Sequence, residues 1–170
     1  PNSCLSFPGT VLFEGTKLSE GRGTTRALEV VGAPNIEPFS LLKKMNEDLK
    51  KWKFEGVVLR PQMFWPTFQK HAGKSCGGFH IHITDSAKAK GWSVGQYLLR
   101  VFHQELGSDF EWQDAAYEYE FDKQAIDLIN GTDKLRQWVE QDGTLASLQE
   151  LEALGMSEFM QARSSILLYL

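Results

Sequence analysis

Two carboxylates and two guanidiniums lie within one short segment near the start of the chain. In residues 13–26, Glu14 and Glu20 are followed by Arg22 and Arg26, among three glycines and four hydroxyl side chains. Glycine allows sharp turns and the close approach of a ligand. Arginine offers a planar fork of donors that suits a carboxylate or a phosphate. We therefore interpret the segment as a ligand-facing loop rather than a plain connection.

The spacing of Glu14 and Glu20 allows two interpretations. If the bend brings them together, they resemble the two carboxyls of a glycosidase, about 5 to 5.5 Å apart for retention and 6.5 to 9.5 Å for inversion. Alternatively, one or both pair with Arg22 or Arg26 and brace the loop. We favour bracing for at least one of them, because perturbed charges are often structural. The catalytic residues stay unassigned, with Glu14 and Glu20 as candidates.

A second cluster with possible chemistry is His80-Ile81-His82, which places two imidazoles on one face of a strand. Such a pair can bind zinc if a third ligand, such as His71, Asp85 or Glu14, joins it. The sequence has no HExxH or CxxC spacing to support such a site. We therefore expect no metal and no cofactor, and we expect the two histidines to face a polar surface or cleft.

The glycine-rich segment 68–78 leads into this histidine strand. Its Gly73-Lys74-Ser75 resembles the end of a phosphate-binding loop, but Phe68 occupies the place of the first glycine, and a strand follows instead of a helix. We therefore reject nucleotide binding. Cys76 with His71 would suggest a thiol nucleophile, but the sequence shows no acid to orient the pair.

The elements that must position these residues are predicted from periodicity. Apolar and β-branched runs between turn residues predict strands at residues 10–13, 27–31, 56–60, 63–65 and 77–85. The last of these alternates, with Phe79 and Ile81 on one face and His80 and His82 on the other, as a half-buried strand does. From Pro38 to Trp52, apolar residues recur every three or four positions and predict an amphipathic helix.

The last third of the chain is predicted to be helical. Ser93, with Gln96 three residues later, is typical of a capping box at the start of a helix. Thr132 and Thr144 are predicted to cap two later helices. The apolar end, residues 166–170, is expected to pack as a strand or as the end of a helix.

Together these elements predict one α+β domain over residues 1–170. It should contain a small mixed or antiparallel sheet in the N-terminal half, flanking helices and a helical C-terminal third. A chain of 170 residues is long enough to bury a real core. A net charge of -4 argues against a nucleic-acid partner, and no apolar run approaches the roughly 20 residues of a membrane span.

The start of the chain and its two cysteines are the features that relate to export from the cell. The chain starts abruptly at Pro1 without a basic region followed by an apolar run, so we expect no signal peptide and a mature or excised form. A bridge between Cys4 and Cys76 is an alternative if the protein is exported. Two buried thiols are the more common arrangement.

Several short motifs, taken in chain order, resemble those of one family. They are residues 13–26, Gly32-Ala33-Pro34, Arg60-Pro61, Pro66-Thr67-Phe68, Lys70-His71-Ala72-Gly73, Cys76-Gly77-Gly78, residues 81–85, 117–121 and 126–128, and Leu167-Leu168-Tyr169. The family is that of the bacterial exo-β-N-acetylmuramidases, formerly a domain of unknown function. The resemblance covers nearly the whole chain. Lys17 departs from an expected asparagine, and His80 departs from a more usual glutamine.

The resemblance implies an architecture and an activity. Members have a Rossmann-like N-terminal domain that holds the principal catalytic carboxylate, and this chain resembles the C-terminal domain that follows it. The family releases N-acetylmuramic acid from the non-reducing ends of peptidoglycan fragments, without a metal or nucleotide cofactor. By this resemblance, the chain is an auxiliary domain that contributes loops to a cleft between the domains and is inactive alone.

The resemblance also implies partners and site residues. The expected partners are peptidoglycan fragments or muramic acid glycosides, and the N-terminal domain of the same bacterial protein, in the periplasm or secreted. Arg22 or Arg26 is expected to hold the lactyl carboxylate of muramic acid. The substrate-binding residues are expected to be Glu14, Thr16, Glu20, Arg22, Thr24, His71 and His82.

Two functions from other classes remain as alternatives. The first is a non-catalytic module that binds cell-wall sugars or a protein partner. The second is a metal-dependent hydrolase that uses His80, His82 and Asp85.

Overall fold

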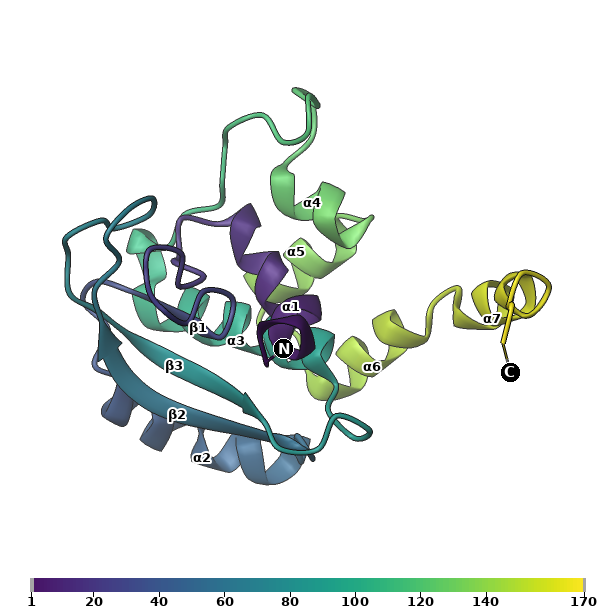
Figure 1. The fold of residues 1–170 in the computed structure, drawn as a ribbon, viewed down its shortest axis with the longest axis horizontal. Helices are drawn as coiled ribbons and strands as arrows, with labels where there is room; N and C mark the ends of the chain where they lie inside the picture. The colour runs from purple at the N-terminus through teal and green to yellow at the C-terminus, as the bar shows by residue number, and fades with distance from the viewer. Residues whose placement is uncertain (1, 170) are drawn as a thin grey trace.

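The computed structural model of the chain describes residues 2–169 and contains a three-stranded antiparallel sheet, which lies on the side of the molecule away from the C-terminus (Figure 1). The strand order is β1-β3-β2, with β1 at Val30–Ala33, β2 at Val57–Phe64 and β3 at Cys76–Ile83. His80 of the central strand β3 pairs with Val30 of β1 on one side and with Arg60 of β2 on the other. This confirms the predicted α+β class and the small antiparallel sheet.

The predicted strands are confirmed in part. The predicted strand 77–85 is β3, and the two short strands at 56–60 and 63–65 form the single strand β2. The strand predicted at 27–31 starts later, as β1. The half-buried pattern is wrong for the first part of β3, because every residue from Cys76 to Ile81 is buried.

The strand predicted at 10–13 is wrong, because this segment is helical. Helix α1 spans Asn2–Thr10 and continues into the 3-10 helix η1, Val11–Gly15. A Cβ atom at Gly9 would lie 2.0 Å from the carbonyl oxygen of Gly91, so α1 crosses α3 (Gly91–Leu106) almost backbone to backbone. This tertiary contact overrides the local strand preference of Thr10-Val11-Leu12-Phe13.

Helix α2 spans Pro38–Trp52, as predicted. Pro38 occupies the first turn, where its missing N–H has no partner to lose. The carboxylate of Glu37 accepts hydrogen bonds from the amides of Phe39 and Ser40 and so caps the helix. The apolar face of α2 packs with Phe79 and Ile81 of the sheet and with α3 in one core.

Helix α3 does not begin as predicted. It starts at Gly91, and the hydroxyl of Ser93 is buried within its first turn instead of capping it. Gln96, the other half of the predicted capping box, donates to Asn130 Oδ1 at 2.8 Å. The predicted capping box is therefore wrong, since both residues face the interior.

The C-terminal third is helical, as predicted. After η2 (Gly107–Asp109), its helices are α4 at Ala125–Asn130, α5 at Lys134–Glu140, α6 at Leu145–Ala153 and α7 at Met156–Ser164. Thr144 caps α6 through a hydrogen bond from the Ser147 amide, which confirms that prediction. Near α5, the hydroxyl of Thr132 accepts from the Lys134 amide, although Asp133 is the residue at the cap position.

Helix α7 projects from the body, beyond α6 (Figure 1). The apolar end was expected to pack, and this is wrong for residues 166–169. Ile166, Leu168 and Tyr169 have exposed fractions of 77%, 87% and 86%. Leu170 lies outside the described residues.

Two further predictions can be compared with the structure. Cys4 is exposed and Cys76 is buried, and both are free thiols, so the alternative of a Cys4–Cys76 bridge is wrong. Within residues 2–169, no helix has the length and apolar character needed to cross a membrane.

Candidate functional site

We call residues 13–26 the opening loop. Arg22 lies at the centre of an ionic network within it. Its Nη2 donates to Glu14 Oε1 at 2.5 Å, and its Nε lies 3.1 Å from Glu20 Oε1. The hydrogen bond that Arg22 donates to Glu14, together with the charges of both carboxylates, raises the pKa of Arg22. The two glutamates are thus held by one guanidinium, as the bracing interpretation expected.

A second loop joins the network through Lys70. Lys70 Nζ donates to Glu20 Oε2 at 2.8 Å and to the Phe13 carbonyl oxygen at 2.9 Å. The side chain of Glu20 is only 2% exposed, so its charge needs these cationic partners. In this network the cations Arg22 and Lys70 therefore balance the anions Glu14 and Glu20.

Tight backbone turns hold the opening loop in place. Gly21 and Gly23 have φ angles of 78° and 83°, which suit glycine. The Gly23 carbonyl oxygen accepts from both the amide and the hydroxyl of Thr67, each at 2.9 Å. Thr24 donates its hydroxyl to the Gly21 carbonyl oxygen at 2.7 Å. The opening loop is thereby fixed against the loop that follows β2.

A third loop reaches the network through Tyr117. Its hydroxyl donates to Glu14 Oε2 at 3.3 Å, and burial followed by the charge of Glu14 raises its pKa. Tyr117 and Glu120 close a tight turn whose central residues, Glu118 and Tyr119, have φ angles of 49° and 68°. Positive φ at two residues other than glycine is strained, and such strain is concentrated at functional sites.

The loop that carries Lys70 also contains residues other than glycine with positive φ angles. Gln69 and His71 have φ angles of 62° and 57°. The ring of His71 forms a hydrogen bond between Nε2 and the Lys17 carbonyl oxygen at 2.9 Å. Burial, together with the charges of Lys74 and Lys70, lowers the pKa of His71. His71 is therefore held beside the opening loop, and its lowered pKa favours the neutral ring.

A cavity of about 300 Å³ lies next to this contact. Lys17, which forms an ion pair with Asp114 at 2.8 Å, is on its wall with His71. The remaining lining residues are mostly polar: Leu18, Ala33, Pro34, Asn35, Lys74, Leu106, Ser108, Asp109 and Glu111. Its size suits a sugar-sized ligand, and its mixed charges suit a polar one.

The predicted histidine pair lies in a different place, on the sheet. The rings of His80 and His82 stack with centroids 3.9 Å apart, and His80 contacts Glu29 through Nε2 at 3.2 Å and Arg60 through Nδ1 at 3.1 Å. Within residues 2–169, no three His, Cys, Asp or Glu side chains converge to hold a metal ion. The metal-hydrolase alternative therefore lacks a ligand set in the described part of the chain.

The thiol alternative also fails on geometry and charge. Cys76 is fully buried, and burial raises the pKa of its thiol to about 11. Its sulfur contacts the carbonyl oxygen of Lys74, whereas His71 is committed to Lys17. A thiol in this state is protonated near neutral pH and is a poor nucleophile.

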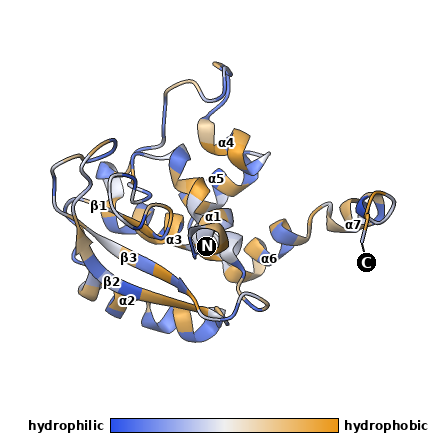
Figure 2. Cartoon of the chain, viewed as in Figure 1, coloured by the Kyte–Doolittle hydropathy of each residue, from blue (hydrophilic) through white to orange (hydrophobic). Residues whose placement is uncertain are grey.

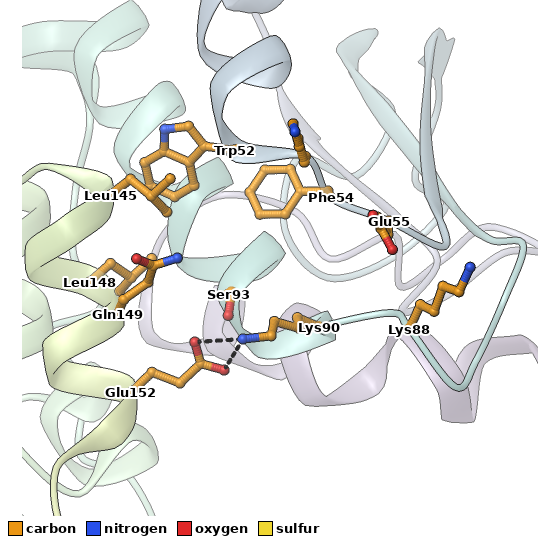
Figure 3. Close-up of a pocket in the computed structure, with 11 residues that line it drawn as sticks. Trp52, Phe54, Glu55, Lys88, Lys90, Ser93, Leu145, Leu148, Gln149 and Glu152 are labelled. Carbon is orange, nitrogen blue, oxygen red and sulfur yellow. Dashed lines mark hydrogen bonds and ion pairs between the residues drawn. The ribbon is translucent and has the colours of Figure 1, made fainter.

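A separate cavity of about 180 Å³ lies between the end of α2 and α6 (Figure 3). Trp52 and Phe54 form one wall, and an ion pair of 3.4 Å between Lys90 and Glu152 spans the opposite side. Ser93 points into this region, and its hydroxyl is buried without a hydrogen-bond partner. None of the residues predicted for the site lines this cavity.

The structure therefore brings together some of the predicted site residues. Glu14, Glu20 and Arg22 form one network, and His71 lies beside the same loop. Thr16 is fully buried and its hydroxyl donates to the Phe13 carbonyl oxygen, which gives it a structural contact; its predicted substrate contact stays a prediction. Thr24 closes a turn. Arg26 and His82 lie elsewhere, Arg26 beside Glu29 and His82 beside His80.

Two residues of the network were not predicted as site residues. Lys70 and Tyr117 both occur in motifs that carried the family resemblance, which is the signal that marks them. Their partners, Glu20 and Glu14, are 50 and 103 residues away in sequence, so no local pattern indicates the contacts.

The fold and the site define an α+β domain in which three loops present a braced polar surface beside a cavity. The family described as "Exo-beta-N-acetylmuramidase NamZ, C-terminal" matches residues 5–169, and this chain belongs to it. The peptidoglycan beta-N-acetylmuramidase NamZ of Bacillus subtilis (strain 168) is 32% identical over 167 residues. That match covers 98% of this chain but only 37% of the relative.

Two solved structures share the fold. Both are DUF1343 family proteins from Bacteroides fragilis NCTC 9343, with TM-scores of 0.78 and 0.62 at 19% and 22% sequence identity. Each match covers 98% of this chain, and 42% and 40% of the respective solved chains. The chain thus spans less than half the length of each relative, in agreement with a domain of a larger bacterial protein.

Proposed function

We propose that this domain is the auxiliary half of an exo-acting β-N-acetylmuramidase. The whole protein releases N-acetylmuramic acid from the non-reducing ends of peptidoglycan fragments, in the periplasm or outside the cell. A companion N-terminal domain supplies the catalytic carboxylate. This domain supplies three loops, residues 13–26, 65–74 and 113–121, which form one wall of the substrate cleft.

The observation that carries the proposal is the network around Arg22. All three loops meet in it, through Glu14, Lys70 and Tyr117. Because Glu14 and Glu20 are both paired with cations, neither is placed as a free acid or base within this domain. Such a network holds loops rigidly for a ligand and leaves the bond cleavage to another group.

Arg22 is our proposed contact for the lactyl carboxylate. It uses Nε and Nη2 on the two glutamates, and a guanidinium has five N–H donors, so donors remain for a ligand. Its side chain is 37% exposed, which leaves it open to a ligand. Arg26 is more exposed, at 54%, but it pairs with Glu29 on the histidine side of the loop.

The test uses the longer protein that contains both domains, with a chromogenic muramic acid glycoside as substrate. We expect hydrolysis by the two-domain protein and none by this domain alone. Arg22→Ala should raise KM about 10-fold or more, since a charge-assisted hydrogen bond contributes about 1.5 to 3 kcal/mol. Arg26→Ala is the matched control and should leave KM unchanged.

The results distinguish two failures. An unchanged KM in Arg22→Ala rejects the assignment of Arg22 to the lactyl carboxylate. Absence of hydrolysis by the two-domain protein rejects the muramidase proposal as a whole.

A non-catalytic module that binds cell-wall sugars is the second candidate. Four exposed aromatic side chains on two of the loops favour it, because sugar rings stack on aromatic faces: Trp65, Phe68, Tyr119 and Phe121. Under this alternative, the two-domain protein would bind insoluble peptidoglycan without releasing N-acetylmuramic acid. Measuring both binding and release on one sample separates the two candidates.

A further inference from the structure

The end of the chain presents a large apolar surface that the rest of the domain leaves uncovered. We define residues 154–169 as the C-terminal arm; it consists of α7 and the segments on either side of it. No residue of α7 is buried. Eight large apolar side chains of the arm are exposed between 40% and 87%: Leu154, Met156, Phe159, Met160, Ile166, Leu167, Leu168 and Tyr169. Figure 2, coloured by hydropathy, shows orange, hydrophobic stretches in α7 where it projects from the body.

The apolar residues of α7 share one face. Phe159 and Met160 follow Met156 by three and four residues, so the three side chains lie along one side of the helix. Arg163, seven residues after Met156, lies at the C-terminal end of the same side. Glu158 lies on the opposite side. Three large apolar side chains on one side of a helix usually pack against another element.

The base of the arm is fixed to the domain. In α6, Leu148 is 1% exposed, and Glu152 forms its ion pair with Lys90 across the cavity of Figure 3. Beyond α6, the chain turns at Gly155, whose φ is 73°, and α7 leaves the body. The arm is therefore a projection from an anchored helix.

The size of the apolar surface indicates an interface. If each of the eight side chains exposes roughly 100 Å², less than the 150 to 250 Å² that an aromatic side chain can bury, the arm exposes about 800 Å² in total. One partner contributes about 800 Å² to a specific stable interface.

We infer that the arm docks on the companion domain of the same polypeptide, an inference that rests on the proposed two-domain architecture. The family match runs through residue 169, so the arm belongs to the domain that the relatives share. This chain covers 37% of the curated relative, so most of that relative's length lies outside the matched part. That remainder is large enough to bury the arm.

The charge of the arm fits a permanent apolar contact. Its acidic and basic residues are Glu158 and Arg163, which balance each other, so no electrostatic attraction to a nucleic acid or an anionic surface is expected. Interfaces between permanent partners are more apolar than transient ones. The arm then fixes the companion domain relative to the anchored helix α6.

Photo-crosslinking in the longer, two-domain protein tests the inference. Benzoylphenylalanine replaces Phe159 in one variant and, as the control, Glu158 in another. We expect position 159 to crosslink within one polypeptide to peptides of the companion domain, at several-fold higher yield than position 158. Neither substitution requires the interface to be disrupted, so misfolding does not obscure the result.

Three other outcomes would overturn the inference. These are a crosslink from position 159 to residues 2–153 of its own domain, a crosslink to a second copy in a covalent dimer, and no excess over position 158. Hydrolysis of the muramic acid glycoside is measured on the same samples. A crosslink without hydrolysis rejects the proposed function alone, and hydrolysis without the crosslink rejects the docked arm alone.

Discussion

Lys70 and Glu20 join two loops that are 50 residues apart in the sequence, through a contact of 2.8 Å between Nζ and Oε2. The side chain of Glu20 is 2% exposed and that of Lys70 is 19% exposed, so the pair is largely shielded from water. Arg22 holds the other carboxylate oxygen of Glu20. A buried carboxylate with two cationic partners is stable only while both remain.

We expect Lys70→Met to destabilise the domain by about 3 kcal/mol, at the lower end of the cost of breaking a buried ion pair. The methionine preserves most of the length of the side chain but leaves one oxygen of Glu20 without its cation. Urea unfolding followed by circular dichroism measures the loss as a lower midpoint.

Lys74→Met in the same loop is the matched control. Lys74 is exposed, so its replacement should change the free energy of unfolding by less than about 0.5 kcal/mol. Equal midpoints for the two variants would mean that the Lys70–Glu20 pair contributes nothing to stability.

Features that depend on near neighbours were predictable from the sequence. Helix α2 has a clear apolar period, and its start at Pro38 follows from local chemistry. The pairing of Glu14 with Arg22 joins residues only eight apart. The sequence could therefore indicate that the glutamates brace the opening loop.

Features that depend on distant neighbours were not predictable. Tyr117 reaches Glu14 from 103 residues away, so nothing near either residue signals the contact. Thr10-Val11-Leu12-Phe13 has the local preference of a strand, but the close crossing of α1 and α3 at Gly9 favours a helix. The capping box at Ser93 failed because both side chains are buried away from the helix end: Gln96 bonds to Asn130, and Ser93 faces the cavity beside Trp52.

The turn at Gly23 provides a second test of the loop geometry. A Cβ atom there would lie 2.7 Å from the backbone nitrogens of Thr67 and Phe68, and the φ of Gly23 is 83°. Gly23→Ala should therefore cost about 1 to 2 kcal/mol for the left-handed backbone, and about 1 to 3 kcal/mol more for the overlap.

Gly131→Ala separates these two contributions. Gly131 has a φ of 72°, but nothing lies within 4 Å of its added Cβ. When both variants are unfolded in urea, Gly131→Ala should lose only the free energy that the left-handed backbone costs an alanine. If Gly131→Ala were as destabilising as Gly23→Ala, the packing of Thr67 and Phe68 against Gly23 would have no energetic role.

The two thiols should differ sharply in reactivity. Cys4 is exposed, whereas Cys76 is buried and has its pKa raised to about 11. A thiol reagent near neutral pH should modify Cys4 alone in the native protein and both residues after denaturation. Mass spectrometry counts the adducts, and Cys4→Ser should abolish native labelling. Equal labelling of Cys76 in the native state would contradict its burial.

Acidification should destabilise the domain through His82. Burial lowers the pKa of His82 first, and the charges of His80, Arg60 and Arg26 lower it further, against an opposing effect of Glu29. The folded pKa therefore lies below the ordinary value of 6.5. Between these two values the unfolded chain binds more protons than the folded one, so the free energy of unfolding falls as the pH falls through about 6.5.

His82→Gln removes this titration without removing the polar side chain. The variant should lose less stability than the wild type when the pH is lowered from about 7.5 to about 5.5, because it has no proton to take up on unfolding at this position. Thr84→Gln, at the exposed position just after the end of β3, should keep the wild-type pH dependence. Urea unfolding at both pH values measures the difference. If His82→Gln and the wild type lost equal stability, protonation of His82 would not account for the loss of unfolding free energy in acid.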